Sequence, residues 1–177
     1  HNASGTFAGG GTLDLGTAGS PNNLTLNSNL ILSASTISVI LGSIGTGNIN
    51  GASTLTVQNT LSANKGTISS GLTIDSTGSV EVYNTNNAVT ISGATSIVTG
   101  GTLLIHDFIN DATNTELNVT GTITTAGLIQ LDSGSGSTDS VILDAASGTI
   151  TVSSGGELEI NAGSGGARTV NGEINNS

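Results

Sequence analysis

Short segments in which apolar and polar residues alternate recur along almost the whole chain of 177 residues. Residues 53–57 (STLTV), 71–74 (GLTI) and 157–160 (ELEI) show the pattern, and Gly, Asn or Ser separates each segment from the next. Strict alternation places successive side chains on opposite sides of an extended strand, and the segments follow one another too closely for helices to lie between them. The sequence therefore predicts an all-β fold.

The spacing of these segments indicates how the strands are arranged. The first apolar residues of three segments, Leu55, Leu72 and Val89, lie 17 residues apart, and the same step separates Val141 from Leu158. Repeats of about 20 residues without helices are typical of a solenoid, in which each coil contributes short strands and stacks on its neighbours. We therefore expect a β-solenoid (parallel β-helix) of short strands, with Gly, Asn and Ser in its turns.

The aliphatic residues of these segments form the predicted core. Its inward columns are expected to include Leu55, Val57, Leu72, Ile74, Val89, Ile91, Leu103, Ile105, Leu117 and Val119, while Ile68, Ile97, Ile109 and Ile123 would supply the other sides of the coils. Aromatic residues make up only 2% of the chain. This scarcity favours a narrow solenoid core over the alternative, a β-sandwich pilin-like domain, whose sheets lie about 10 Å apart and normally need aromatic side chains to fill the gap.

The length of the chain fits a single β-rich domain covering residues 1–177. Residues 1–22 are less regular than the rest, because Gly9, Gly10 and Gly11 interrupt the pattern, and we expect this part to be either an arm or an irregular first coil. The first residue is His1 rather than Met, which fits a chain from which a leader has been removed.

Charge and composition exclude several classes of partner. The chain has 2 Lys and Arg residues against 12 Asp and Glu residues, with a net charge of −10. Because binding to phosphate backbones depends on Lys and Arg, we expect no nucleic-acid partner. Cysteine is absent, so there is no disulfide and no thiolate metal site. No apolar run approaches the roughly 18–20 residues that a membrane-spanning helix needs.

The sequence predicts that the protein is not an enzyme and needs no cofactor. Glu157 and Glu159 lie on one side of a predicted strand, which is a suitable geometry for a pair of catalytic carboxylates. Enzymes that act on acidic sugars add basic residues, however, and here only Lys65 and Arg168 are present. We therefore interpret Glu157 and Glu159 as a solvated strand face.

Two groups of residues raise the question of metal binding. His1 and His106 could together hold copper, but no exposed, preorganised set of ligands surrounds them, and we interpret His106 as a solvated strand position. The acidic residues within 106–111 and 132–139 could offer oxygen ligands to calcium. Residues 132–139 (DSGSGSTD) have the composition of a solvated loop, so we predict no metal site.

Threonine residues at the outward middle of several segments suggest an ice-binding surface. Thr56, Thr73, Thr90 and Thr151 occupy such positions, but Glu81, Leu104, Asn118, Ile142 and Glu159 occupy the equivalent positions of other segments. The column is therefore expected to be broken. Asn2, Asn23, Asn118 and Asn175 each begin an Asn-x-Ser/Thr sequence and would permit glycosylation in an exporting pathway that glycosylates.

The repeated segments resemble the β-helical shafts of bacterial surface proteins, namely filamentous haemagglutinin-like exoproteins and autotransporter passengers. The matching stretches include 53–57, 71–74, 101–105 and 148–160, so the resemblance covers residues 50–165. It implies an exported, non-enzymatic role at the cell surface. It transfers no functional residue.

These observations lead to a structural interpretation. The first and last predicted strands carry little charge, so the ends of the solenoid lack the usual protection against edge-to-edge pairing. We expect an extracellular, self-assembling filament or surface layer whose copies join head to tail through Phe7, Leu13, Leu15, Val170 and Ile174. The alternative is a shaft fragment of a large cell-surface adhesin, with a host or surface glycan left open as its target. A third interpretation is an ice- or carbohydrate-binding module.

Overall fold

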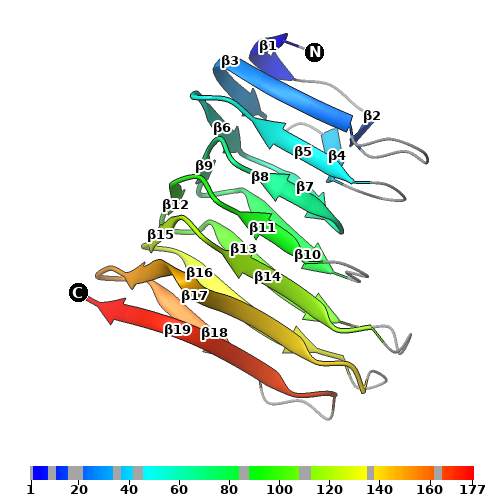
Figure 1. Ribbon diagram of the computed structural model, residues 1–177. Coiled ribbons are helices and arrows are strands. Elements are labelled where there is room, and N and C mark those ends of the chain that lie inside the picture. Colours follow the sequence, from blue (N-terminus) through cyan, green and yellow to red (C-terminus); the bar gives the residue numbers. More distant parts are fainter. Residues whose placement is uncertain are drawn as a thin grey trace.

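The computed structural model is a solenoid of parallel β-strands whose coils stack one above another, with the N- and C-termini at opposite ends (Figure 1). It describes residues 2–7, 11–15, 22–33, 37–41, 46–83, 88–107, 113–134, 138–161 and 165–177. Among these residues there is no helix, and hence none long and apolar enough to cross a membrane. The predicted all-β class and β-solenoid architecture are confirmed.

The strands belong to two sheets, in which neighbouring strands are parallel. The 12-stranded sheet contains β1 (Asn2–Phe7), β3 (Asn22–Leu32), β5 (Gly47–Asn50), β6 (Thr54–Val57), β8 (Gly66–Ile68), β9 (Gly71–Ile74), β11 (Val89–Ile91), β12 (Thr95–Ile97), β14 (Thr115–Val119), β15 (Thr122–Thr125), β17 (Val141–Val152) and β19 (Arg168–Asn176). The 7-stranded sheet contains β2 (Gly11–Leu15), β4 (Ile37–Leu41), β7 (Thr60–Ala63), β10 (Ser79–Tyr83), β13 (Thr102–Asp107), β16 (Leu128–Ser133) and β18 (Glu157–Ile160).

The larger sheet bends at a corner and covers two sides of the solenoid. Strand β3 pairs with β5 through residues 22–25 and with β6 through residues 30–32, and β17 changes partner in the same way between β14 and β15. We call the side that contains β5, β8, β11 and β14 face 1, the side that contains β6, β9, β12 and β15 face 2, and the 7-stranded sheet face 3. Each coil passes through faces 1, 2 and 3 in that order.

Inward side chains of successive coils stack into apolar columns. On face 1, for example, Leu24 lies next to Ile49, Ile49 next to Ile68, and Ile68 next to Ile91. The core prediction is confirmed, since all of its members are buried: Leu55, Val57, Leu72, Ile74, Val89, Ile91, Leu103, Ile105, Leu117 and Val119. Of the additional positions, Ile68, Ile97 and Ile123 are also buried, while Ile109 lies outside the described residues. Each such side chain stabilises the fold by about 1.5–3 kcal/mol.

The step of 17 residues corresponds to one coil between Leu55 and Leu72, but not between Leu72 and Val89. Leu55 and Leu72 are neighbours in one column of face 2. Leu72 is next paired with Thr95, however, whereas Val89 lies on face 1 between Gly66 and Leu117. Val89 is therefore inward, as predicted, but it does not continue the column of Leu55 and Leu72. Alternation distinguishes inward from outward positions but does not say on which face a strand lies.

Glycine occupies corners where successive coils come closest. Gly66 begins β8 with a φ of +139°, and an added Cβ would overlap the carbonyl oxygen of Gly47 in the coil before it. A residue with a side chain would meet both an unfavourable backbone conformation and a steric clash at this position. The close stacking of the coils at this corner therefore depends on glycine.

Residues 1–22 contain the strands β1 and β2, which belong to the solenoid. Strand β1 pairs with β3, with a shift of register between Ala3 and Gly5, and β2 pairs with β4 without a shift. The two strands form the first coil, and the shift makes it irregular.

Candidate functional site

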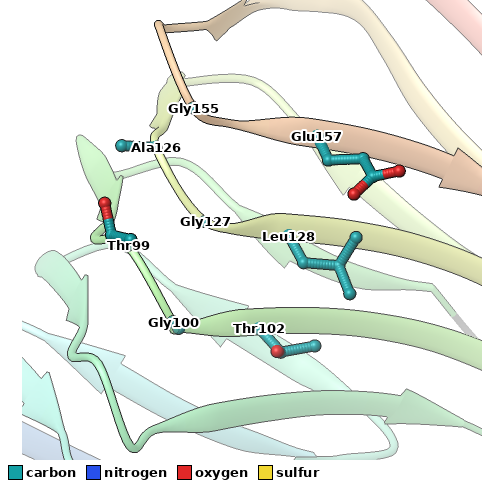
Figure 2. A pocket seen from close by; sticks show the side chains of 9 residues that line it. Thr99, Gly100, Thr102, Ala126, Gly127, Leu128, Gly155 and Glu157 are labelled. Atoms are coloured by element: carbon teal, nitrogen blue, oxygen red, sulfur yellow. The ribbon is translucent and has the colours of Figure 1, made fainter.

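A groove of about 300 Å³ lies at the corner where face 2 passes into face 3 (Figure 2). It crosses three coils and is lined by Thr99, Gly100, Gly101, Thr102, Ala126, Gly127, Leu128, Gly155 and Glu157. Tight turns create it: the amide of Gly101 donates to the carbonyl of Val98 at 2.8 Å, and the amide of Gly156 donates to that of Ser153 at 2.8 Å. Thr102, Leu128 and Glu157 lie above one another on neighbouring strands.

The chemistry that this groove offers is limited to hydrogen bonding and one carboxylate. Of the residues that line it, Glu157 alone is ionisable. Glu159 lies two positions further along β18, next to Gln130, so the two carboxylates share the outward side of one strand as expected. Arg168 is engaged elsewhere, because its guanidinium donates to the carbonyls of Gly166 and Ser133 at 2.9 and 3.0 Å. Lys65 lies in the turn between β7 and β8.

His106 lies in an outward column of face 3 and is half-buried. Its ring stacks on that of Tyr83 with the ring centres 5.2 Å apart, and Asp132 occupies the same position one coil further on. Burial lowers the pKa of His106 from its ordinary value because it disfavours the charged imidazolium, and the carboxylates of Asp132 and Asp107 oppose this shift. His106 is an outward strand position, as expected, but it is half-buried rather than solvated, while His1 lies outside the described residues.

The acidic residues considered as calcium ligands do not come together. Asp107 points into the core and accepts a hydrogen bond from the hydroxyl of Thr115 at 3.0 Å. Asp132 is on β16 and faces outward, Asp139 is buried, and Asp111 lies outside the described residues. No group of three or more His, Cys, Asp or Glu side chains within the described part of the chain could hold a metal ion. Residues 132–139 are therefore not one solvated loop, as the sequence had suggested. Asp132 belongs to strand β16 at one end, and Asp139 is buried at the other.

The outward side of face 2 carries a column of hydroxyl side chains. Thr56 is paired with Thr73, Thr73 with Ser96, Ser96 with Thr124, and Thr124 with Thr151. Thr54, Thr122 and Thr149 lie two residues earlier on their strands and point to the same side. We call these eight residues the threonine face: Thr54, Thr56, Thr73, Ser96, Thr122, Thr124, Thr149 and Thr151.

The expectation that the threonine column is broken is wrong, because the interrupting residues lie on other faces. Glu81, Leu104 and Glu159 belong to β10, β13 and β18 of face 3. Asn118 and Ile142 belong to the face 1 strands β14 and β17, and Thr90 itself lies on β11 of face 1. Three faces follow one another along the chain, so equivalent outward positions in the sequence are not neighbours in space.

Three of the four possible glycosylation sites have described side chains. Asn23 and Asn175 are exposed, and Asn118 is half-buried beside a hollow of about 160 Å³ that Thr90 and Asp144 also line. The side chain of Asn2 lies outside the described part. The carboxamide oxygen of Asn23 accepts a hydrogen bond from the side chain of Asn48 at 2.9 Å, which joins two coils.

The residues predicted to join copies lie at opposite ends of the solenoid. Phe7 and Leu13 are on β1 and β2, and nothing is described of their side chains, while the neighbouring Leu15 packs against the core. At the other end, Val170 and Ile174 of β19 are half-buried against the core.

The predicted set of joining residues did not include Leu158 and Ile160 at this second end, although the ELEI pattern of β18 marks both as inward. Leu158 is stacked on Ile129, and Ile160 is stacked on Leu131. Ile160 is 52% exposed, whereas Leu131 is fully buried. Among the described residues, the inward columns of face 3 have no member beyond Leu158 and Ile160.

No protein-family model matches the chain, and no curated protein or solved structure is detectably similar to it. The roles of the groove, the threonine face and the end of the solenoid can therefore be inferred only from their chemistry.

Proposed function

We propose that the chain is a non-enzymatic structural subunit of an extracellular filament or surface layer, in which one copy stacks on the next. The observation that supports this most directly is the uncovered end of the core. Leu158, Val170 and Ile174 are only partly buried and Ile160 is exposed, at positions that the preceding coils cover completely. Covering such apolar surface is favourable by about 25 cal/mol per Å².

The backbone favours the same kind of contact. Within the described residues, β18 pairs only with β16, and β19 pairs only with β17, so each presents one edge without a strand partner. At the opposite end, β1 and β2 are the outermost strands of their sheets. Exposed parallel edges accept a further strand readily. Joining one end to the other is a head-to-tail contact, which generates an open fibre when its rotation does not close a ring.

The resemblance of the repeated segments to β-helical shafts of bacterial surface proteins supports an extracellular location. The groove at the corner of faces 2 and 3 supports a non-enzymatic role, since Glu157 is the one ionisable side chain among those that line it. General acid–base chemistry at such a site would need a second positioned group, and Glu159, on the same side of β18, does not line the groove. The alternative function is a shaft fragment of a large adhesin, in which the covering coil belongs to the same polypeptide.

Assembly of the purified chain tests this proposal. We expect sedimentation velocity to show a concentration-dependent series of oligomers, and electron microscopy to show fibres. Ile160→Lys should abolish assembly, because it places a charge in the middle of the joint. Gln130→Lys is the matched control, since it adds the same charge on the outward side of the neighbouring strand β16 and should assemble normally.

Deleting residues 1–16 tests the other end of the joint. It removes β1 and β2 and should leave a soluble species without fibres. Wild-type protein that stays monomeric at every concentration would overturn self-assembly and favour the shaft of a longer adhesin. Unchanged fibres from Ile160→Lys would remove the uncovered columns from the joint.

A further inference from the structure

The threonine face differs from the rest of the surface in carrying no charge. None of the described residues in β6, β9, β12 and β15, or in residues 149–152 of β17, is ionisable. Most acidic side chains lie on the other faces: Glu81, Asp132, Glu157 and Glu159 on face 3, and Glu116 and Asp144 on face 1. Asp75 directly follows β9 at the border of the threonine face, where it accepts a hydrogen bond from the side chain of Gln58 at 2.7 Å. A protein with a net charge of −10 thus has one side whose strands carry no ionisable residue.

The hydroxyl groups of this face also have no hydrogen-bond partner among the described residues. On face 1, polar side chains bond to one another: Asn48 donates to Asn23, and Ser69 donates to Asn50, both at 2.9 Å. On face 2, none of the eight hydroxyls of the threonine face makes a hydrogen bond to another described residue. These groups therefore keep their full capacity to bond to something outside the chain.

One column of hydroxyls, from Thr56 on β6 to Thr151 on β17, is unbroken, whereas the column two residues earlier is interrupted because Thr54 is paired with Gly71. Neighbouring strands lie about 4.7–4.9 Å apart, and residues two apart on a strand are separated by about 6.6 Å. No shift of register interrupts the ladder from β6 through β9, β12 and β15 to β17. Threonine is β-branched and has few side-chain rotamers, so its hydroxyl and methyl groups hold a fixed orientation with little loss of entropy on binding.

A column of hydroxyl and methyl groups on strands without charge fits some surfaces and not others. Sugar-binding sites stack the ring on an aromatic side chain, and protein interfaces depend on Trp, Tyr and Arg, none of which occurs among the described residues of face 2. Charged polymers find no opposite charge on it. The surface planes of ice present neutral water molecules that both donate and accept hydrogen bonds, as the hydroxyls of the threonine face do.

We propose that the threonine face binds ice. The hydroxyls hydrogen-bond to water molecules at lattice positions, and the methyl groups between them order the water that fills the remaining places. Each contact is weak, and the affinity comes from repeating it over β6, β9, β12, β15 and β17 without deformation of the sheet. This inference does not rest on the proposed filament, since the face is complete within one copy.

Ice itself is the probe for this proposal. We expect the purified full chain to lower the freezing point below the melting point, to inhibit recrystallisation, and to coat a single ice crystal when labelled at its amino groups. Thr73→Lys places a long charged side chain in the centre of the face and should abolish these effects. Thr90→Lys is the matched control: it changes the same residue type, at a half-buried outward position of face 1, and should leave them intact.

The possible outcomes separate this proposal from its rivals. Wild-type protein without effect on ice growth overturns it, and so does equal loss of activity in Thr73→Lys and Thr90→Lys. Binding to crystalline cellulose or chitin without an effect on ice would assign the face to a polysaccharide instead. Should circular dichroism show that Thr73→Lys does not fold, Thr124→Ser replaces it, because it removes one methyl group and should reduce the activity. Ile160→Lys, which blocks assembly, should still bind ice.

Discussion

The middle and the last coils of the solenoid contain the same pattern and differ in what covers them. Ile105, Leu131 and Ile160 occupy successive positions of one inward column of face 3. Ile105 is fully buried between its two neighbours, while Ile160 is 52% exposed. An inward residue of a solenoid thus acquires its burial from two adjacent coils, and one missing neighbour removes about half of it. Position along the axis, as well as residue type, sets the contribution of a side chain to stability.

The largest expected effect comes from placing a charge inside a covered column. Ile74 is fully buried between Val57 and Ile97, so Ile74→Asp leaves a carboxylate without water or a partner and should abolish folding. Circular dichroism and thermal unfolding measure this. Ile160→Asp is the matched control and should fold, because its carboxylate reaches water. If Ile74→Asp melts within a few degrees of wild type, the inward assignment of β9 is wrong.

Truncation of Ile105 and Ile160, which share one column of face 3, gives a smaller and more quantitative contrast. Ile105→Ala should lower the free energy of unfolding by about 2–5 kcal/mol, because it leaves a cavity between two coils. Ile160→Ala should cost less than about 1 kcal/mol, as expected for an exposed position. Chemical denaturation at a concentration too low for assembly provides both values. Equal costs for the two variants would show that Ile160 is covered as well as Ile105 in the single chain. This result would contradict the uncovered end of the core.

Two glycines with positive φ angles allow a corner where coils lie close together to be compared with a corner that is open. Gly66→Ala should cost about 3 kcal/mol, at the upper end of backbone strain, because its φ is +139° and the new Cβ overlaps the carbonyl of Gly47. Gly155→Ala, at a φ of +84° with no atom within 4 Å of the added Cβ, should cost only the conformational term of about 1–2 kcal/mol. Thermal unfolding of both variants measures the difference. A smaller loss for Gly66→Ala than for Gly155→Ala would contradict the close approach of coils at this corner.

The smallest effect concerns the half-buried His106 in the middle of face 3. Its folded-state pKa lies below the ordinary value of 6.5, so the unfolded chain binds the proton more tightly. The stability that neutral His106 contributes is complete above pH 6.5 and is lost as the pH falls through the folded-state pKa. We expect the free energy of unfolding to fall with decreasing pH more steeply in wild type than in His106→Gln. Identical pH profiles of the two proteins would contradict this.

The sequence predicted the inward positions well because alternation reports them directly. Leu55 and Val57 flank the outward Thr56, and the structure buries both. The same pattern in β18 could have identified Leu158 and Ile160 as the end of the core. The buried pair of Asp107 and Thr115 had no such signal, since a carboxylate at an inward position reads as a loop residue until its partner on the next strand is known.

The assignment of strands to faces could not be predicted from alternation, and the candidate sites depended on it. Along face 1, the residues Leu24, Ile49, Ile68, Ile91 and Val119 stack directly, although 25, 19, 23 and 28 residues separate them. Turns of different lengths at the corners account for these different separations, and the length of such a turn cannot be predicted from the sequence pattern. For this reason Glu81 and Asn118 appeared to interrupt a column of threonines to which they do not belong.

The hydrogen bonds between coils run along the axis of the solenoid, and this determines how it would respond to a pull on its two ends. Tension would act on all three faces of one coil boundary together, so the boundary resists until many bonds break at once. An inner coil would be released once its hydrogen bonds to the coils on both sides have broken. The coil from Ile68 to Ile91 contains 23 residues and would add about 80 Å of extended chain. Such a molecule would lengthen in discrete steps under force, and each step would dissipate mechanical energy while the remaining coils stay intact.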